Sequence, residues 1–318
     1  MQQQTSSISN FKRFFLRILL PLILIVSVVG VLFSIFFEQK IIFNSDLCGA
    51  YKVHRITNET HEDEVPVFGS SRAEGSYIPD SLGKTFFNYG LPGTKYDVTL
   101  FFLQQECTKK KNDPLIVLNF DLDGLITGLG DISNYIPSVG NAEVKALIGN
   151  QYKPYYSIPF LKYYGLFDTY TRFYINNKVQ LTKISNKGAA LDKNILTKKS
   201  FDALVEQRKN TKVVFTNKPE LETKLLRIIK EHPERIFAIV IAPYHSSYFV
   251  NYSNPMDAEL FIAKLRAMQN VRVFDFSKMP LADELFLNTT HVNYKGAQVF
   301  SHILKDSLAA IRSTVVNP

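Results

Sequence analysis

Residues that build metal or redox centres are scarce in this sequence. It has two cysteines, Cys48 and Cys107, and six histidines among 318 residues. No pair or triplet of these residues has the spacing of a metal site, so we expect neither a metal nor a cofactor. The cysteines are compatible with a disulfide in an oxidising compartment or with two separate buried thiols, and the sequence favours neither.

Stripes of basic and aromatic residues are also missing. The formal net charge is +8, but Lys12, Arg13 and Arg17 precede the first acidic residue and the remaining excess is dispersed. This distribution argues against nucleic-acid binding. The basic bias fits an anionic partner such as a membrane surface or an acidic glycan. The chain has no internal repeat or low-complexity tract, and 46% hydrophobic residues suffice for a core.

Charged residues are absent between residues 18 and 37. A helix of this length would span about 30 Å, the thickness of a bilayer's hydrocarbon core, and we predict a transmembrane helix over 14–37. The basic residues before it place residues 1–13 in the cytoplasm and the rest of the chain outside it. A cleaved signal peptide is the alternative, but its apolar core is usually shorter and ends at small residues, which 33–37 lack.

Five short apolar runs follow a polar connector over 38–64. They cover 65–68, 85–89, 115–120, 236–242 and 271–276 and alternate with helical patterns. This alternation predicts an α/β fold over 65–318, a three-layer α/β/α sandwich with about five parallel strands. Residues 125–215 break this alternation of strand and helix patterns, because they contain many tyrosines and prolines and only fragments of helical pattern. We interpret them as an α-rich insertion that covers the crevice at the strand ends.

The first apolar run stops at residues 69–72, which read Gly-Ser-Ser-Arg. A glycine there lets the chain turn sharply, so that the next side chain stands at the mouth of the crevice. A serine in that place needs a base that takes its proton. The best candidate is His291, near the other end of the chain. Each feature alone is more often structural, as a turn, an anion-binding helix start or a packed histidine.

The order of three motifs resembles the SGNH (GDSL-type) hydrolase superfamily. The motifs are residues 69–72, Asn-Tyr-Gly at 88–90 and Asn-Thr-Thr-His at 288–291. Behind a single N-terminal membrane helix, the Gly-Ser-Ser-Arg form resembles the membrane-anchored branch with DltD-like and polysaccharide O-acetylation proteins. The resemblance covers about residues 65–310 and implies the flavodoxin-like SGNH fold.

The resemblance also implies a catalytic site with Ser71 as nucleophile and His291 as its base. Backbone N–H groups of Ser71 and Gly90 would meet the oxyanion, together with the third-motif position, where this chain has Asp123. An aspartate would repel the oxyanion unless it is protonated. Asn288 stands where the family has aspartate. Its carbonyl can accept from the Nδ1–H of His291, but it offers no charge to the imidazolium.

Further candidates surround this set. The carboxylates Asp283 and Asp275 are alternative supports for the base. Three residues are candidate substrate contacts. Arg72 can hold a phosphate or carboxylate, or instead fix its own loop through a salt bridge. Tyr244 and His245 end a strand at the same sheet edge, and His245 is the alternative base.

For function, the resemblance implies a membrane-anchored acyl esterase or O-acyltransferase acting on ester-linked groups, above all acetyl, of a cell-envelope polysaccharide. The implied partners are that polysaccharide or another acylated glycan, and a membrane-bound O-acyltransferase as donor. The implied location is the bacterial inner membrane, with the folded domain in a periplasmic or extracellular space. The competing hypothesis is a catalytically degenerate SGNH domain that binds glycan or scaffolds an assembly complex. Hydrogen-bond reach between Ser71 Oγ and His291 Nε2 would support catalysis.

Overall fold

The computed structural model describes residues 11–316, except 165, 168–169, 173–174 and 176–182, and it describes side chains as far as residue 311. The chain forms two compact units. The N-terminal unit comprises Met1–Tyr51 and Tyr135–Lys183, and the α/β unit comprises Lys52–Asn134 and Ile184–Pro318. Most of the tail predicted over 1–13 lies outside the described residues.

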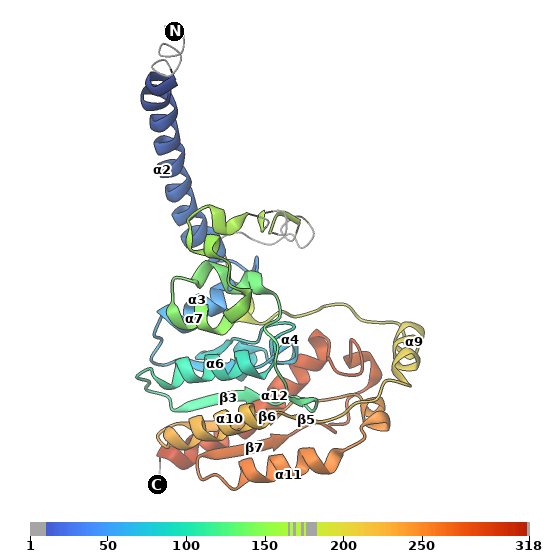
Figure 1. Ribbon diagram of the computed structural model, residues 1–318. Coiled ribbons are helices and arrows are strands. Elements are labelled where there is room, and N and C mark those ends of the chain that lie inside the picture. Colours follow the sequence, from blue (N-terminus) through green and yellow to red (C-terminus); the bar gives the residue numbers. More distant parts are fainter. Residues whose placement is uncertain (1–10, 165, 168–169, 173–174, 176–182, 317–318) are drawn as a thin grey trace. The chain divides into compact units, whose positions relative to one another are not determined.

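The α/β unit is built on a parallel sheet of five strands in the order β2-β1-β3-β6-β7. Strands β3, β6 and β7 of this sheet are labelled in Figure 1. The central strands are apolar except for Asn119 at the end of β3, because both faces of the sheet are covered, as the burial of every residue of β3 shows. The predicted α/β fold class is therefore confirmed. The strands are Val65–Phe68 (β1), Phe86–Asn88 (β2), Leu115–Asn119 (β3), Ile236–Ile241 (β6) and Val271–Asp275 (β7).

Helices cover both faces of the sheet. On one face, strand side chains such as Val240 form a core with α4, α5 and α12. On the other, Phe68 meets Phe102 of α6 at 6.1 Å between ring centroids, and Phe120 meets Phe261 of α11 at 5.5 Å. Helix α10 lies beside α6. The bounds are Ser71–Ser76 (α4), Pro79–Leu82 (α5), Tyr96–Cys107 (α6), Pro219–Glu231 (α10), Pro255–Arg266 (α11) and Tyr294–Val316 (α12).

The strand order fixes where a site can form. From β1 the chain moves to β2 on one side, and it then crosses to β3 on the other side of β1. The carboxyl ends of β1 and β3 therefore flank a topological switch point, where open α/β sheets leave a crevice. Residues 69–72 follow β1 directly, and residues 120–123 follow β3.

Several local elements were not predicted. The connector over 38–64 contains the helix α3 (Ala50–Asn58), and a two-stranded sheet pairs β4 (Gly124–Leu125) with β5 (Thr216–Asn217). The α/β unit also holds the unpredicted helices η9 (Ser246–Asn251) and η10 (Asp283–Leu285). Its helices η8 (Asn186–Gly188) and α9 (Lys198–Arg208) lie within the α-rich insertion predicted over 125–215. Neither Cys48 nor Cys107 forms a disulfide among the described residues, and burial raises the pKa of the Cys107 thiol to about 12.

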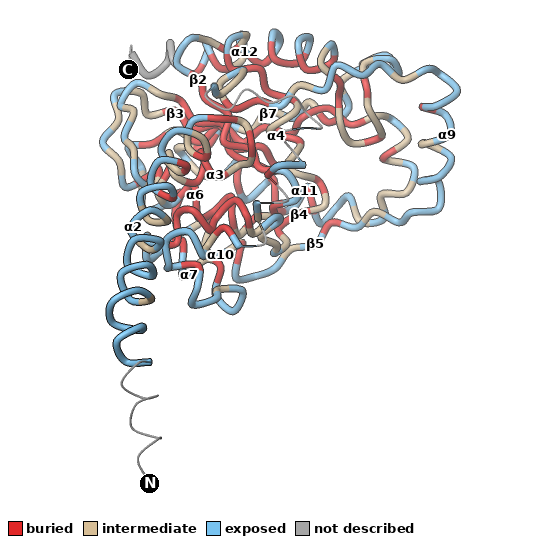
Figure 2. Tube along the Cα trace, turned by 90° about the horizontal axis from the view of Figure 1, so that it is seen from above, coloured by how far each residue is buried: buried red, intermediate tan, exposed pale blue. Residues whose placement is uncertain are grey.

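The N-terminal unit contains one continuous helical stretch, Phe11–Ile42, which is long and apolar enough to cross a membrane. It comprises η1 (Phe15–Leu19), α2 (Leu20–Phe37) and η2 (Glu38–Ile42). Apolar residues along α2 are exposed, and most of the α2 tube in Figure 2 is accordingly pale blue. The other named elements of this unit are η4 (Ile136–Ser138), α7 (Ala142–Ile148), η5 (Gly149–Gln151), η6 (Pro154–Ser157) and η7 (Leu161–Tyr163). The helix η3 (Ile132–Asn134) belongs to the α/β unit.

The insertion predicted over 125–215 is divided between the two units. Its middle part, residues 135–183, groups with the apolar N-terminal helix, where Phe37 meets Tyr163 at 5.2 Å between ring centroids. Its ends belong to the α/β unit. The domain boundaries and the covering role of the insertion stay predictions.

Candidate functional site

A sharp turn after β1 presents Ser71. Gly69 has φ +150°, and a Cβ added there would lie 2.7 Å from the Cβ of Ala73, so only glycine fits. Ser70 caps the following helix, since its Oγ accepts a hydrogen bond from the Arg72 N–H at 3.2 Å. Ser71 is consequently the first residue of α4.

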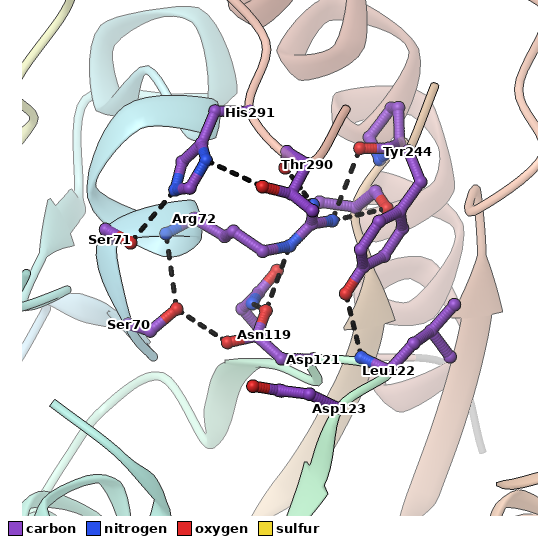
Figure 3. A network of polar contacts seen from close by, with 12 residues as sticks. Ser70, Ser71, Arg72, Asn119, Asp121, Leu122, Asp123, Tyr244, Thr290 and His291 are labelled. Carbon is purple, nitrogen blue, oxygen red and sulfur yellow. Dashed lines mark hydrogen bonds and ion pairs between the residues drawn. The ribbon is translucent and has the colours of Figure 1, made fainter. Parts of the chain in front are cut away.

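Ser71 and His291 come together across 220 positions of sequence. The Ser71 Oγ and the His291 Nε2 are 3.0 Å apart (Figure 3). The histidine lies on the loop between η10 and α12, which is closed by a hydrogen bond from the Leu287 N–H to the His291 carbonyl at 2.8 Å. The predicted distance criterion is met. The catalytic roles of both residues stay predictions.

The imidazole of His291 is held in one tautomer by Asn288. The Asn288 Oδ1 accepts from the backbone N–H groups of Thr290 at 2.9 Å and His291 at 3.0 Å, so the amide oxygen must face the imidazole. The Asn288 Oδ1 lies 3.2 Å from His291 Nδ1, and the Thr290 Oγ1 lies 2.9 Å from the same Nδ1. Because the Thr290 hydroxyl donates to Asn288 Oδ1, both oxygens can accept from Nδ1–H. Nε2 then offers its lone pair to Ser71.

The imidazole is also kept uncharged. Burial, with the positive charges of Arg72 and Arg208, lowers the pKa of His291 to about 4. A neutral imidazole at neutral pH can accept the Ser71 proton. The imidazolium that follows would have no carboxylate at Nδ1, where the polar neighbours are Asn288 and Thr290.

Arg72 points into the protein and not toward a substrate. Its guanidinium donates to the carbonyls of Ala242, at 2.8 Å, and Thr290, and it stacks 3.4 Å over the Tyr244 ring. Its Nε lies 3.0 Å from Asp121 Oδ1 in an ion pair. The residue is 5% exposed. The predicted substrate contact is therefore corrected: Arg72 ties the ends of three strands and the His291 loop together.

Asp121 is a site residue whose part the sequence analysis missed. Its Oδ2 accepts from the Ser70 hydroxyl at 2.6 Å, and its Oδ1 accepts from Asn119 Nδ2 at 2.7 Å in addition to the Arg72 contact (Figure 3). This carboxylate links the residues after β3 to the turn that carries Ser71. An acidic residue two positions beyond a central strand, at a switch point, is the sequence signal that could have indicated it.

The two residues after β6 have different surroundings. Tyr244 is buried, and its hydroxyl oxygen accepts from the Leu122 N–H at 2.8 Å, so it supports Arg72 and is not available as a substrate contact. His245 lies with Nδ1 2.7 Å from Ser247 Oγ and Nε2 3.1 Å from Asp283 Oδ1. Asp283 thus supports His245 and not His291.

Asp275, the other alternative support, is likewise occupied elsewhere. Its Oδ1 accepts from the Ser277 N–H at 2.9 Å, directly after β7. In the part of the chain that the structure describes, no contact joins Asp275 to His291.

Two of the three predicted oxyanion positions have other partners. The Gly90 N–H donates to Asn88 Oδ1 at 2.9 Å, and Asp123 pairs with Lys95 Nζ at 2.9 Å. Burial and the nearby Asp121 raise the pKa of Asp123. The Ser71 N–H has no acceptor among the described residues, as expected at the first position of a helix.

A cavity of about 260 Å³ adjoins the histidine loop. Thr289 and Thr290 form part of its wall, and the end of α9 and the η9 segment form the rest. Arg208 lines it and is exposed, whereas the neighbouring Lys209 pairs with Glu206 at 3.3 Å. A larger cavity of about 520 Å³, near the end of β7, includes neither Ser71 nor His291 in its lining.

Metal chemistry has no candidate centre within the described ranges. No group of three or more histidine, cysteine, aspartate or glutamate side chains is arranged there to hold an ion.

Comparison with known proteins gave limited similarity. No protein-family model matches the chain, and no curated protein sequence matches it significantly. One solved structure that it resembles is a protein from Streptococcus pneumonia, provisionally described as a platelet activating factor. The two chains are 14% identical, the match covers 86% of this chain and 96% of the other, and the TM-score is 0.40. At this identity and TM-score the similarity has no weight in assigning a function.

Proposed function

We propose that this protein is a membrane-anchored acyl esterase or O-acyltransferase that uses a Ser71-His291 pair. The observation that carries the proposal is the 3.0 Å contact between Ser71 Oγ and His291 Nε2 at the switch point of the sheet. The tautomer imposed by Asn288 directs the free Nε2 lone pair to the serine, which is the arrangement that an activated nucleophile requires.

In the first half-reaction Ser71 Oγ attacks the carbonyl carbon of an ester, and its proton passes to His291 Nε2. The Ser71 N–H is a donor for the developing oxyanion, and each such donor contributes about 10²–10³-fold to rate. The C–O bond of the ester then breaks, and His291 returns the proton to the departing alcohol. An acyl group stays on Ser71.

In the second half-reaction another hydroxyl attacks the acylated serine, and His291 takes its proton and returns it to Ser71 Oγ. Water as attacker makes the protein an esterase, and a glycan hydroxyl makes it a transferase. Support for an acetyl ester of an envelope polysaccharide, and for a membrane-bound O-acyltransferase as donor, comes from the resemblance to the membrane-anchored SGNH branch and from the apolar N-terminal helix.

A catalytically degenerate domain that binds glycan or scaffolds an assembly complex is the second candidate. It is favoured by the Gly90 N–H donating to Asn88 and by Asp123 pairing with Lys95, which leave one of the predicted oxyanion donors open. The amide of Asn288 beside His291, in the place of the family's carboxylate, also favours a catalytically degenerate domain.

Hydrolysis of p-nitrophenyl acetate by the full chain in detergent micelles tests the proposal. We expect turnover that Ser71→Ala abolishes, with an acylated Ser71 detectable by mass spectrometry after rapid quenching. Ser81→Ala, which removes a hydroxyl from α5 outside the site, is the matched control and should retain the wild-type rate. Equal rates for wild type and Ser71→Ala would reject the nucleophile and favour the scaffold.

A further inference from the structure

Exposed apolar side chains of the N-terminal unit extend beyond its membrane-spanning helix. They gather in the described residues of one stretch, 155–164, 166–167, 170–172 and 175, which we name the apolar segment. Tyr164 is 81% exposed and Ile175 64% exposed. Such a concentration of exposed aromatic and aliphatic side chains marks an interaction surface. Its exposed members within the described residues are Tyr155, Ile158, Phe160, Leu161, Tyr164, Phe167 and Ile175.

The apolar segment packs along the membrane-spanning helix. The ring of Phe160 fills the space left by the missing side chain of Gly30, where an added Cβ would lie 2.8 Å from the ring. About two turns further along, Phe37 meets Tyr163 at 5.2 Å and Phe167 at 5.7 Å between ring centroids. These contacts fix the height of the segment on the helix.

That height lies within the apolar span. Gly30 precedes Glu38, the first charged residue after the span, by eight positions, so Phe160 lies about 12 Å below that charge at 1.5 Å of rise per residue. If the helix crosses a bilayer, Phe160 must share its hydrocarbon environment. Tyr163 and Phe167, which contact Phe37, then lie nearer the interface, where aromatic rings are favoured.

Several polar groups near this height are paired with one another, as a lipid environment favours. The Phe160 N–H donates to Ser34 Oγ at 3.0 Å, and the Ser34 hydroxyl can donate to Glu38 Oε1 at 3.4 Å. Lys162 forms an ion pair with Glu38. Ser34 is 1% exposed although most of α2 is open, because the apolar segment covers it, and Phe37, which the same segment contacts, is 8% exposed.

We propose that the apolar segment inserts into the lipid bilayer beside the membrane-spanning helix and forms a second membrane contact. Its partner is the interface and upper hydrocarbon layer of the leaflet at the C-terminal end of the helix. Lipid is favoured over a protein partner because the exposed rings continue the lipid-facing surface of the helix at the same height.

The lack of tryptophan in the sequence allows a direct test. Tyr164→Trp and Phe167→Trp, made separately in the full chain, each introduce a single reporter at an exposed position. The chains are reconstituted into phosphatidylcholine-phosphatidylglycerol vesicles with and without lipids brominated on the acyl chains. Val250→Trp, at a site in the α/β unit that is 77% exposed, is the matched control.

We expect both segment reporters to have blue-shifted emission and to lose more than half of it in brominated vesicles, while the Val250→Trp emission is unaffected. Unquenched emission at the wavelength of water-exposed indole from both reporters would overturn the proposal. Blue-shifted emission without quenching would overturn it too, since it would mean that a second copy or another protein covers the segment. The result does not depend on esterase activity.

Discussion

Asn288 is the residue whose replacement we expect to raise the rate of the proposed reaction most. Its Oδ1 already receives the N–H groups of Thr290 and His291 and faces His291 Nδ1, so a carboxylate oxygen can take the same contacts. What the amide lacks is the negative charge that stabilises the imidazolium formed during attack.

We expect Asn288→Asp to raise the rate of ester hydrolysis by at least about tenfold, because the reverse change in a serine protease costs about 10⁴-fold. The new charge should also raise the pKa of His291. Initial rates on p-nitrophenyl acetate between pH 3.5 and 8 measure both effects. Asp283→Asn, which removes a carboxylate that contacts His245, should leave the rate unchanged. A rate for Asn288→Asp at or below wild type would contradict the proposed role.

The pH dependence follows from the lowered pKa of His291. The base is neutral above a pKa of about 4, so kcat/KM should rise through pH 4 and level off above about pH 5. Arg208→Gln removes a positive charge that lowers this pKa, and its acid limb should move to higher pH. Lys199→Gln, on the same helix but outside the cavity lining, is the matched control. An unshifted limb in Arg208→Gln would show that its charge does not act on His291.

The same shift makes His291 a source of acid sensitivity. Between pH 4 and the ordinary value of 6.5, the unfolded chain binds a proton that the folded chain does not. The free energy of unfolding should therefore rise with pH across this window.

Arg72 should matter for stability. In Arg72→Met the carboxylate of Asp121 loses its ion-pair partner at a largely buried position, which costs about 3–5 kcal/mol for a buried pair. Urea denaturation of the full chain in micelles should show this loss. Arg72→Met combined with Asp121→Asn should recover part of it. A double variant as unstable as the sum of the single variants would show that the two charges are not coupled.

At the scale of elements, the contact between the β2 end and α4 sets the position of Ser71. Gly90 lies against the helix backbone, where an added Cβ would be 2.4 Å from the Glu74 nitrogen and 3.0 Å from the Ala73 carbonyl carbon. Backbone atoms cannot move aside singly, so a side chain at position 90 must displace the whole of α4.

Gly90→Ala should therefore destabilise the fold by about 1–3 kcal/mol. It should also lower esterase activity by about 10²-fold, because the nucleophile shifts relative to His291. Gly140→Ala, where no atom lies within 4 Å of the added Cβ, is the matched control for glycine replacement and should change neither quantity. Denaturation curves and kcat/KM measured for both variants test these two predictions. Wild-type activity in Gly90→Ala would show that α4 does not depend on this contact.

At the scale of the whole molecule, we expect the helix Phe11–Ile42, which is long and apolar enough to cross a membrane, to determine where the proposed chemistry takes place. Lys12, Arg13 and Arg17 precede the apolar span, and basic residues are retained on the cytoplasmic side. Alkaline phosphatase fused after residue 318 should be active in a bacterial host, and β-galactosidase at the same place should not. The opposite pattern would put the α/β unit in the cytoplasm and exclude an envelope substrate.

Local patterns in the sequence determined much of this protein. The five strand runs and the apolar helix were predictable because strand and membrane-helix signals depend on neighbouring residues only. The pairing of Ser71 with His291 could be predicted from motif order, since parallel strands deliver their carboxyl ends to one edge.

Only the tertiary structure decided which polar groups remain open for chemistry. The sequence could not show that Arg72 turns inward to Asp121, or that the Gly90 N–H is taken by Asn88. It also could not show that Phe160 fits against Gly30, 130 positions earlier in the chain. Each of these contacts joins residues by shape and hydrogen bonding after folding. The residues around either partner do not indicate such a contact, because it depends on a residue far away in the sequence. A strand or a membrane helix, in contrast, can be predicted from the residues that form it.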